Sequence, residues 1–200
     1  MNRLFIIMVL VTISSLSCFA QDIKLPAPNK TGGKPLMNAL NERQSNREFS
    51  DKELSLQTLS DLLWAANGFN RETKRTAPSS QDRQELDLYV FLKSGVYFYD
   101  AKNQQLILKV TGNNQAKTGG QPFVASAPLN IVFVANLDKA SNRDAALIDC
   151  GFISQNIYLF CASEDLISVV RGSVDKTEVH KLLGLNEKQE VLLAQTVGYK

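Results

Sequence analysis

The chain has 200 residues, of which 44% are hydrophobic and 21% are charged, and its formal net charge is +2. This composition is typical of one globular domain with enough apolar side chains to build a core. It excludes a disordered chain, and the near-neutral charge argues against a nucleic-acid-binding protein.

Residues 1–20, MNRLFIIMVLVTISSLSCFA, have the pattern of a secretory signal peptide. Arg3 precedes an apolar run that is too short for a membrane-spanning helix, and small residues lead to Ala20. We therefore expect cleavage before Gln21, export to the periplasm and a mature net charge of +1. The alternative is a lipid anchor on Cys18, although the residues before Cys18 fit a lipobox poorly.

The N-terminal half of the mature chain contains two predicted helices. Residues 21–34 are rich in Pro, Lys, Asn and Gly, which indicates an extended arm or linker ahead of a single domain at 35–200. Pro35 is suited to the first position of a short helix. Ser50-Asp51-Lys52-Glu53 reads as a capping box that starts a second helix, which Gly68 is expected to end.

The remaining elements form a strand-rich series. Predicted strands are 86–92, 95–100, 104–110, 130–136, a strand or turn at 166–173, and 190–198. The segment 130–136 contains a continuous apolar run, IVFVA, as in a central strand. Loops are expected at 69–84 and 111–126, a long buried helix at 144–163, and a shorter helix capped by Asp175 and Glu178. This order predicts an α+β fold in which helices pack on a mainly antiparallel sheet.

Two cysteines remain after the predicted cleavage, Cys150 and Cys161. They are eleven residues apart in one predicted helix, or about 16 Å along its axis. A disulfide between them is therefore excluded, and we expect both to be core residues.

The stretch NERQSNREFS places Arg43, Ser45 and Arg47 at every second position. In an extended segment all three side chains leave on one side, because a strand has a period of two. Two guanidinium groups flanking a hydroxyl are well suited to phosphate, whose oxygens match the arginine fork. The alternative is two solvated arginines at the end of a helix, where the helix dipole favours cations.

Four segments together resemble one known family. RQSNREF (43–49) is similar to the arginine-x-serine-x-arginine-x-phenylalanine signature of the nitroreductase family of FMN-dependent oxidoreductases. RTAPSSQDRQ (75–84) resembles its second signature loop, residues 150–175 its long helix and following turn, and VLLAQTVGYK its closing strand. The likeness covers residues 35–200 and is greatest to the branch of azoline-oxidising dehydrogenases. It implies a nitroreductase-like homodimer that binds FMN at the subunit interface.

The resemblance assigns expected roles to three groups of residues. Arg43 and Ser45 match positions that hold the FMN phosphate, and Lys200 lies near a C-terminal basic position that reaches it. Arg47 matches a basic residue over the pyrimidine edge of the flavin, where a cation stabilises the reduced state.

The other matched positions are expected to contact the flavin ring. Pro78, Ser79 and Ser80 match a loop that packs on the flavin from the partner subunit, with Gln84 as a polar position in it. Arg171 and Gly172 lie where the family passes its backbone near the reactive N5 edge.

Three departures from the family pattern stand out. Asp82 replaces the usual Asn of the second signature loop. Asp165-Leu166-Ile167 replaces a Leu-Gly pair and is expected to crowd the flavin edge. The chain ends at Lys200, where many relatives continue with further basic residues, which weakens the phosphate role of Lys200.

The resemblance predicts an exported oxidoreductase that passes a hydride between a donor and a nitroaromatic or quinone-like acceptor. NAD(P)H is cytoplasmic, so another electron donor is equally compatible with export. The alternatives are a flavin-binding protein without turnover and an interaction domain on a degenerate reductase fold. The sequence indicates no metal site, and His180, the one histidine, is predicted to lie on the surface.

Overall fold

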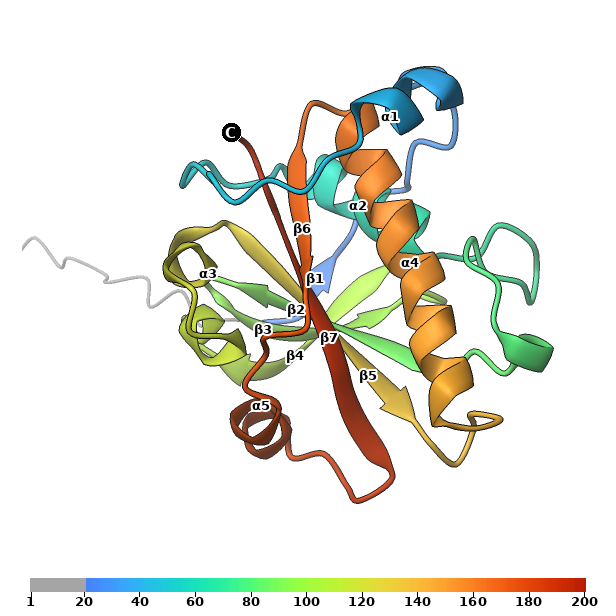
Figure 1. The fold of residues 1–200 in the computed structure, drawn as a ribbon, viewed down its shortest axis with the longest axis vertical. Coiled ribbons are helices and arrows are strands. Elements are labelled where there is room, and N and C mark those ends of the chain that lie inside the picture. Colours follow the sequence, from blue (N-terminus) through green and yellow to red (C-terminus); the bar gives the residue numbers. More distant parts are fainter. Residues whose placement is uncertain (1–20) are drawn as a thin grey trace, which may run out of the picture.

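The computed structural model describes residues 21–200, which form a seven-stranded sheet with helices on both faces (Figure 1). The strand order is β1-β4-β3-β2-β5-β7-β6, and every pair is antiparallel. The strands are β1 (Ile23–Lys24), β2 (Leu86–Leu92), β3 (Gly95–Asp100), β4 (Gln105–Thr111), β5 (Leu129–Asn136), β6 (Ile167–Arg171) and β7 (Gln189–Gly198). The α-helices are α1 (Leu36–Glu42), α2 (Leu56–Asn67), α3 (Pro122–Ser126), α4 (Arg143–Ser163) and α5 (Lys176–Leu183), and the 3₁₀ turns are η1 (Ser80–Asp82) and η2 (Gln115–Thr118).

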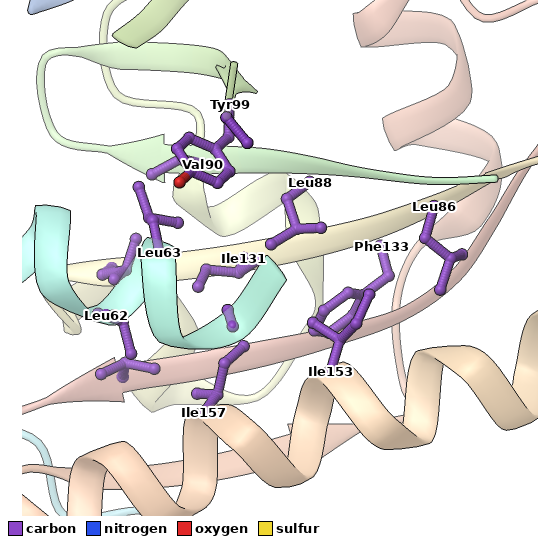
Figure 2. Packing of buried hydrophobic residues seen from close by; sticks show 14 of the residues in the cluster. Leu62, Leu63, Leu86, Leu88, Val90, Tyr99, Ile131, Phe133, Ile153 and Ile157 are labelled. Carbon is purple, nitrogen blue, oxygen red and sulfur yellow. The ribbon is translucent and has the colours of Figure 1, made fainter. Parts of the chain in front are cut away.

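The main core lies between one face of the sheet and helices α2 and α4. Leu62 and Leu63 of α2 and Ile157 of α4 are completely buried against apolar side chains of β2 and β5 (Figure 2). The apolar residues of both helices recur every three to four positions, so one face of each helix is covered by the sheet. This packing fixes where every side chain of α4 points.

A smaller core lies on the opposite face of the sheet. It is formed by Val132 and Val134 of β5, Ala194 of β7 and Val179 of α5. Strand β5 is therefore covered on both faces, which explains its uninterrupted run of apolar residues.

Most predicted elements are confirmed, including the α+β class and the antiparallel sheet. The strands at 86–92 and 95–100 have the predicted bounds, and the long helix begins one residue early, at Arg143. Gly68 ends α2 as predicted, and both Cys150 and Cys161 are free and buried.

Two sequence predictions are wrong. Helix α2 begins after Ser55, whose hydroxyl accepts the Thr58 N–H at 3.0 Å, and not at the capping box of Ser50. The Ser50 N–H and hydroxyl instead face the carbonyl of Tyr199. The segment 111–126 is not a plain loop, because it contains η2 and α3, and Pro122 occupies the first turn of α3 as proline prefers.

The arm at 21–34 is attached to the domain along its length. Its strand β1 pairs with β4, Leu25 is buried in the main core, and the Asn29 N–H donates to Asp61 of α2 at 2.7 Å. Lys34 then forms ion pairs with Glu42 and Asp165. The signal peptide predicted at 1–20 lies outside the described residues.

The core packing predicts the cost of deleting a buried side chain. Ile157→Ala should lower the free energy of unfolding by about 2–5 kcal/mol, because it leaves a cavity between α4 and the sheet. Ile157→Val removes one methylene and should cost only about 0.5–1.5 kcal/mol. Urea unfolding measures both, and equal midpoints for the two variants would contradict the packing.

Candidate functional site

The segment that carries Arg43, Ser45 and Arg47 is extended, as its period-two spacing predicts. Helix α1 ends at Glu42, and Ser45 forms a parallel bridge with Ser168 of β6. The Asn46 N–H donates to the Ser168 carbonyl at 3.0 Å. The segment therefore runs along the free edge of β6, across the end of the sheet in Figure 1.

Tyr158 of α4 holds two of these side chains at one point, and sequence reasoning missed it. Its hydroxyl lies 2.8 Å from Ser45 Oγ and accepts the Val170 N–H at 2.8 Å. The Arg43 guanidinium carbon lies 5.3 Å from the centre of the same ring, within cation–π range. Because the Tyr158 hydroxyl hydrogen can donate to Ser45, the Ser45 hydrogen is left to donate to a ligand.

The C-terminus lies beside the same segment. The Ser50 N–H donates to the Tyr199 carbonyl at 2.9 Å, and exposed Lys200 follows directly. Arg47 is exposed and makes no hydrogen bond or ion pair within residues 21–200. The fold thus brings Arg43 and Ser45 together at Tyr158, with Arg47 in the same extended stretch and Lys200 next to the residue that contacts Ser50.

The loop at 78–84 is an internally bonded turn. Ser79 Oγ accepts the Gln84 N–H at 2.9 Å, and the Ser80 N–H donates to Asp149 of α4 at 2.7 Å. Gln81, Asp82 and Gln84 have φ values of 53°, 56° and 49°, in the left-handed region that side chains disfavour. A strained backbone of this kind is common at binding sites.

The polar side chains of this loop have partners in the preceding residues 73–75. Gln84 accepts from Arg75 and donates to the Thr73 carbonyl. Asp82 pairs with Lys74, and the hydrogen bond from Lys74 lowers the pKa of the Asp82 carboxyl. The negative charge of Asp82, which departs from the family pattern, is therefore balanced by Lys74, just before the loop.

The two predicted binding segments are apart in a single chain. Ser80 is tied to Asp149, whereas Ser45 is tied to Tyr158, nine residues later on α4. That separation is about 13 Å along the helix axis. One chain therefore presents two partial sites and does not bring them together.

Arg171 is part of a buried polar network. It is 4% exposed, and its guanidinium N–H groups donate to Thr196, Asn130, Ser173 and both oxygens of Thr118 at 3.1–3.3 Å. No acidic side chain forms an ion pair with it in the part of the chain that the structure describes, and burial lowers its pKa to about 10. Its side chain therefore holds the turn at Thr118, and only its backbone remains available to a ligand.

Gly172 offers the open backbone that its predicted role requires. It is exposed, and a Cβ placed there would meet no atom within 4 Å. Of the three residues expected to crowd the flavin edge, Asp165 pairs with Lys34, Leu166 is buried in the main core, and Ile167 is the half-buried first residue of β6.

An open cavity of about 590 Å³ lies elsewhere, between the arm, α1, α2 and α4. Its lining includes Lys34, Trp64, Asn156 and Phe160, but none of the predicted phosphate-binding residues. Volume alone would favour this cavity as the site. The chemistry of the donors favours the edge of β6.

Comparison with known proteins agrees with the fold. The family model described as "Nitroreductase family" matches residues 40–199. A crystal structure of a candidate nitroreductase from Ralstonia eutropha JMP134 is 40% identical, with a TM-score of 0.85, and the match covers 92% of this chain and 91% of that one.

Two further relatives extend the comparison. A candidate nitroreductase of Methanocaldococcus jannaschii is 29% identical over 82% of this chain and 91% of its own length. A Desulfovibrio desulfuricans candidate nitroreductase, solved in complex with FMN, has a TM-score of 0.62 and 18% identity over 84% of this chain and 87% of that one. At that identity the likeness shows the fold alone.

The Arg171 network makes a stability prediction. Arg171→Met should lower the free energy of unfolding by about 3 kcal/mol or more, because several buried acceptors lose their donor at about 1–3 kcal/mol each. Arg171→Lys keeps the charge but not the forked hydrogen-bonding geometry, so its free energy of unfolding should lie between those of the wild type and Arg171→Met. Urea unfolding measures the effect, with exposed Arg71→Met as the control that should shift by less than about 0.5 kcal/mol. Equal midpoints for Arg171→Met and Arg71→Met would contradict the role.

Proposed function

The chain belongs to the nitroreductase family, and on that premise we propose that it is an FMN-dependent oxidoreductase. The observation that carries the proposal is the convergence of Arg43 and Ser45 on Tyr158. These groups supply a guanidinium and a hydroxyl donor at one edge of the sheet, and Lys200 follows Tyr199, which contacts Ser50 of the same segment. Such a donor set suits a phosphate monoester.

The residues present fit the cofactor. Arg43 and Ser45 would hold the phosphate, and the open backbone at Gly172 would admit the edge of the flavin ring. Gln121 Oε1 is buried and has no hydrogen-bond partner among residues 21–200; it lies in the loop that Arg171 holds and could accept from a ligand. Bound FMN supplies hydride chemistry, while Arg47 would supply positive charge near the ring, where the reduced state gains negative charge.

We also propose that two copies of the chain complete each site. The partial sites on α4 are about 13 Å apart along the helix, and the family resemblance places the matched loop on the flavin from the partner subunit, so the loop at 78–84 of one copy would face Arg43 and Ser45 of the other. Five large apolar side chains on α1 and α4 are exposed in the single chain and would be covered in such a homodimer. They are Leu36, Met37, Leu40, Ile148 and Phe152.

The substrate proposal is a small organic acceptor, nitroaromatic or quinone-like, reduced through a two-electron exchange with FMN. The signal-peptide pattern of residues 1–20 supports location in the periplasm. Since NAD(P)H is cytoplasmic, a different electron donor, or the oxidase direction, would operate in the periplasm. The FMN held by the Desulfovibrio relative supports the choice of cofactor.

Flavin binding tests the proposed function directly. The purified mature protein should be yellow, or become so with added FMN, and should bleach with dithionite. Arg43→Ala should weaken FMN binding about 10- to 150-fold, the equivalent of a charge-assisted hydrogen bond of about 1.5–3 kcal/mol. Ser45→Ala should cost about 2- to 12-fold.

Titration of FMN fluorescence measures these affinities. Lys102→Ala removes an exposed cation from the turn between β3 and β4 and should leave binding unchanged. A wild-type protein that remains colourless with excess FMN would contradict the proposed function. Equal losses for Arg43→Ala and Lys102→Ala would contradict the assignment of the phosphate site.

The homodimer makes a separate prediction. Phe152→Lys places a charge on the exposed face of α4 and should shift the protein from dimer to monomer in sedimentation velocity, because an unpaired charge is costly inside an interface. Leu56→Lys alters an exposed leucine on α2, which faces Leu92 and Pro128, and should remain dimeric. A wild-type protein that sediments as a monomer at high concentration would exclude the arrangement.

A further inference from the structure

A pair of carboxyl groups is buried beneath the loop at 78–84. Glu85, the residue before β2, is 2% exposed, and Asp149 of α4 is 3% exposed. Neither carboxyl oxygen of Glu85 has a hydrogen-bond donor among residues 21–200. A buried carboxylate without a donor is strongly unfavourable, so its bonding must be completed by a proton or a bound donor.

The surroundings leave the two carboxyl groups facing one small space. Glu85 and Asp149 both line a cavity of about 10 Å³, the size of a single water molecule. Arg75 lines it too, but its Nε and Nη1 atoms donate to Gln84 and to the Asn67 carbonyl. Arg83, the other nearby cation, is exposed and donates to Gln81 and to a backbone carbonyl. No ion pair therefore neutralises the two acids within the described chain.

We propose that Glu85 and Asp149 share one proton, and that this proton fixes the loop at 78–84 on α4. The protonated Glu85 donates to one oxygen of Asp149, and the other oxygen accepts the Ser80 N–H at 2.7 Å. Burial raises the pKa of the Glu85 carboxyl and the adjacent Asp149 adds to the shift, against smaller lowering effects of the Glu85 backbone N–H and of Arg83; the net direction agrees with a retained proton.

Loss of this proton should release the loop. Two carboxylates in one buried space repel each other. Neither residue can move away easily, because the Glu85 carbonyl accepts the Asn136 N–H and Asp149 lies within the packed helix α4. The strained residues at 81–84 form the part that can yield. The hydrogen bond from the Ser80 N–H to Asp149 is therefore weakened when both carboxyl groups are charged.

The sign of the pH dependence follows from the raised pKa. The folded state binds the Glu85 proton more tightly than the unfolded state, so the contribution of this group to stability is greatest at low pH. This contribution is lost as the pH rises from the usual carboxyl range through the raised pKa of Glu85 in the folded protein. Both loop order and stability should therefore fall toward alkaline pH for this reason.

Amide hydrogen exchange of Ser80 tests the proposal without any cofactor. In the full mature protein, the Ser80 protection factor, corrected for intrinsic exchange, should fall about tenfold as the pH is raised from the ordinary carboxyl range, about pH 4, to about pH 9. Glu85→Gln should keep protection within about twofold over that range, because its amide donates to Asp149 permanently. Exposed Glu187→Gln, the matched loss of one carboxyl, should behave as the wild type.

Variants of Asp149 test the shared proton in a second way. Asp149→Asn keeps an acceptor for the Ser80 N–H without the charge and should also be independent of pH. Asp149→Leu removes the acceptor and should leave Ser80 poorly protected at every pH. Flat wild-type protection, or the wild-type profile in Glu85→Gln and Asp149→Asn, would overturn the shared proton.

The consequence for FMN rests on the proposed function. If the loop at 78–84 packs on the flavin, FMN affinity should weaken toward pH 9 in the wild type and not in Glu85→Gln. A pH-independent affinity in the wild type would show that this loop does not bear on the flavin. A wild type that binds no FMN would contradict the proposed function, while the Ser80 measurement would still decide the shared proton.

Discussion

The burial of α4 against the sheet is the constraint on which the candidate site depends. Apolar side chains such as Ile153 and Ile157 fix the rotation of the helix, and this rotation points its polar side chains in set directions. Asp149 then meets Ser80, and Tyr158 meets Ser45 and the start of the segment after α1. Two segments distant in sequence are thus positioned by one helix, whose own position comes from hydrophobic packing.

Buried polar groups, and not apolar contacts, hold the loops at the ends of the sheet. On one face Arg171 is solvated by neutral oxygens of Thr118, Asn130 and Thr196. On the other face the Asp149 carboxyl anchors Ser80. A loop with few apolar residues gains little from burial, so directional bonds to buried partners give it a defined shape. The same bonds make its order sensitive to charge, as the Glu85–Asp149 pair illustrates.

The elements of this fold were predictable from local pattern, whereas the contacts of the site were not. Strand β5 and helix α4 can be recognised from the sequence alone. A strand buried on both faces gives a continuous apolar run, whereas a helix buried along one stripe repeats its apolar residues every three to four positions. Ser50 and Ser55 both precede a helical pattern, and only the tertiary contact with Tyr199 decides between them. Tyr158 occupies a core-like position in its helix, so nothing local marks its bond to Ser45, more than a hundred residues away. Arg43 and Ser45 were recognisable because their motif is contiguous.

The separation of the two partial sites links cofactor binding to assembly. A single chain has the proposed phosphate donors, Arg43 and Ser45, near Tyr158 but holds its own loop at 78–84 at Asp149, about 13 Å away along α4. If a second copy supplies that loop, every FMN molecule contacts two chains, and the bound state exists only in the dimer. Binding must then stabilise the dimer by the same free energy by which dimerisation improves binding. The turn that contains Gln81, Asp82 and Gln84 would then contribute both to FMN binding and to dimerisation. Loss of the proton shared by Glu85 and Asp149 would therefore weaken both.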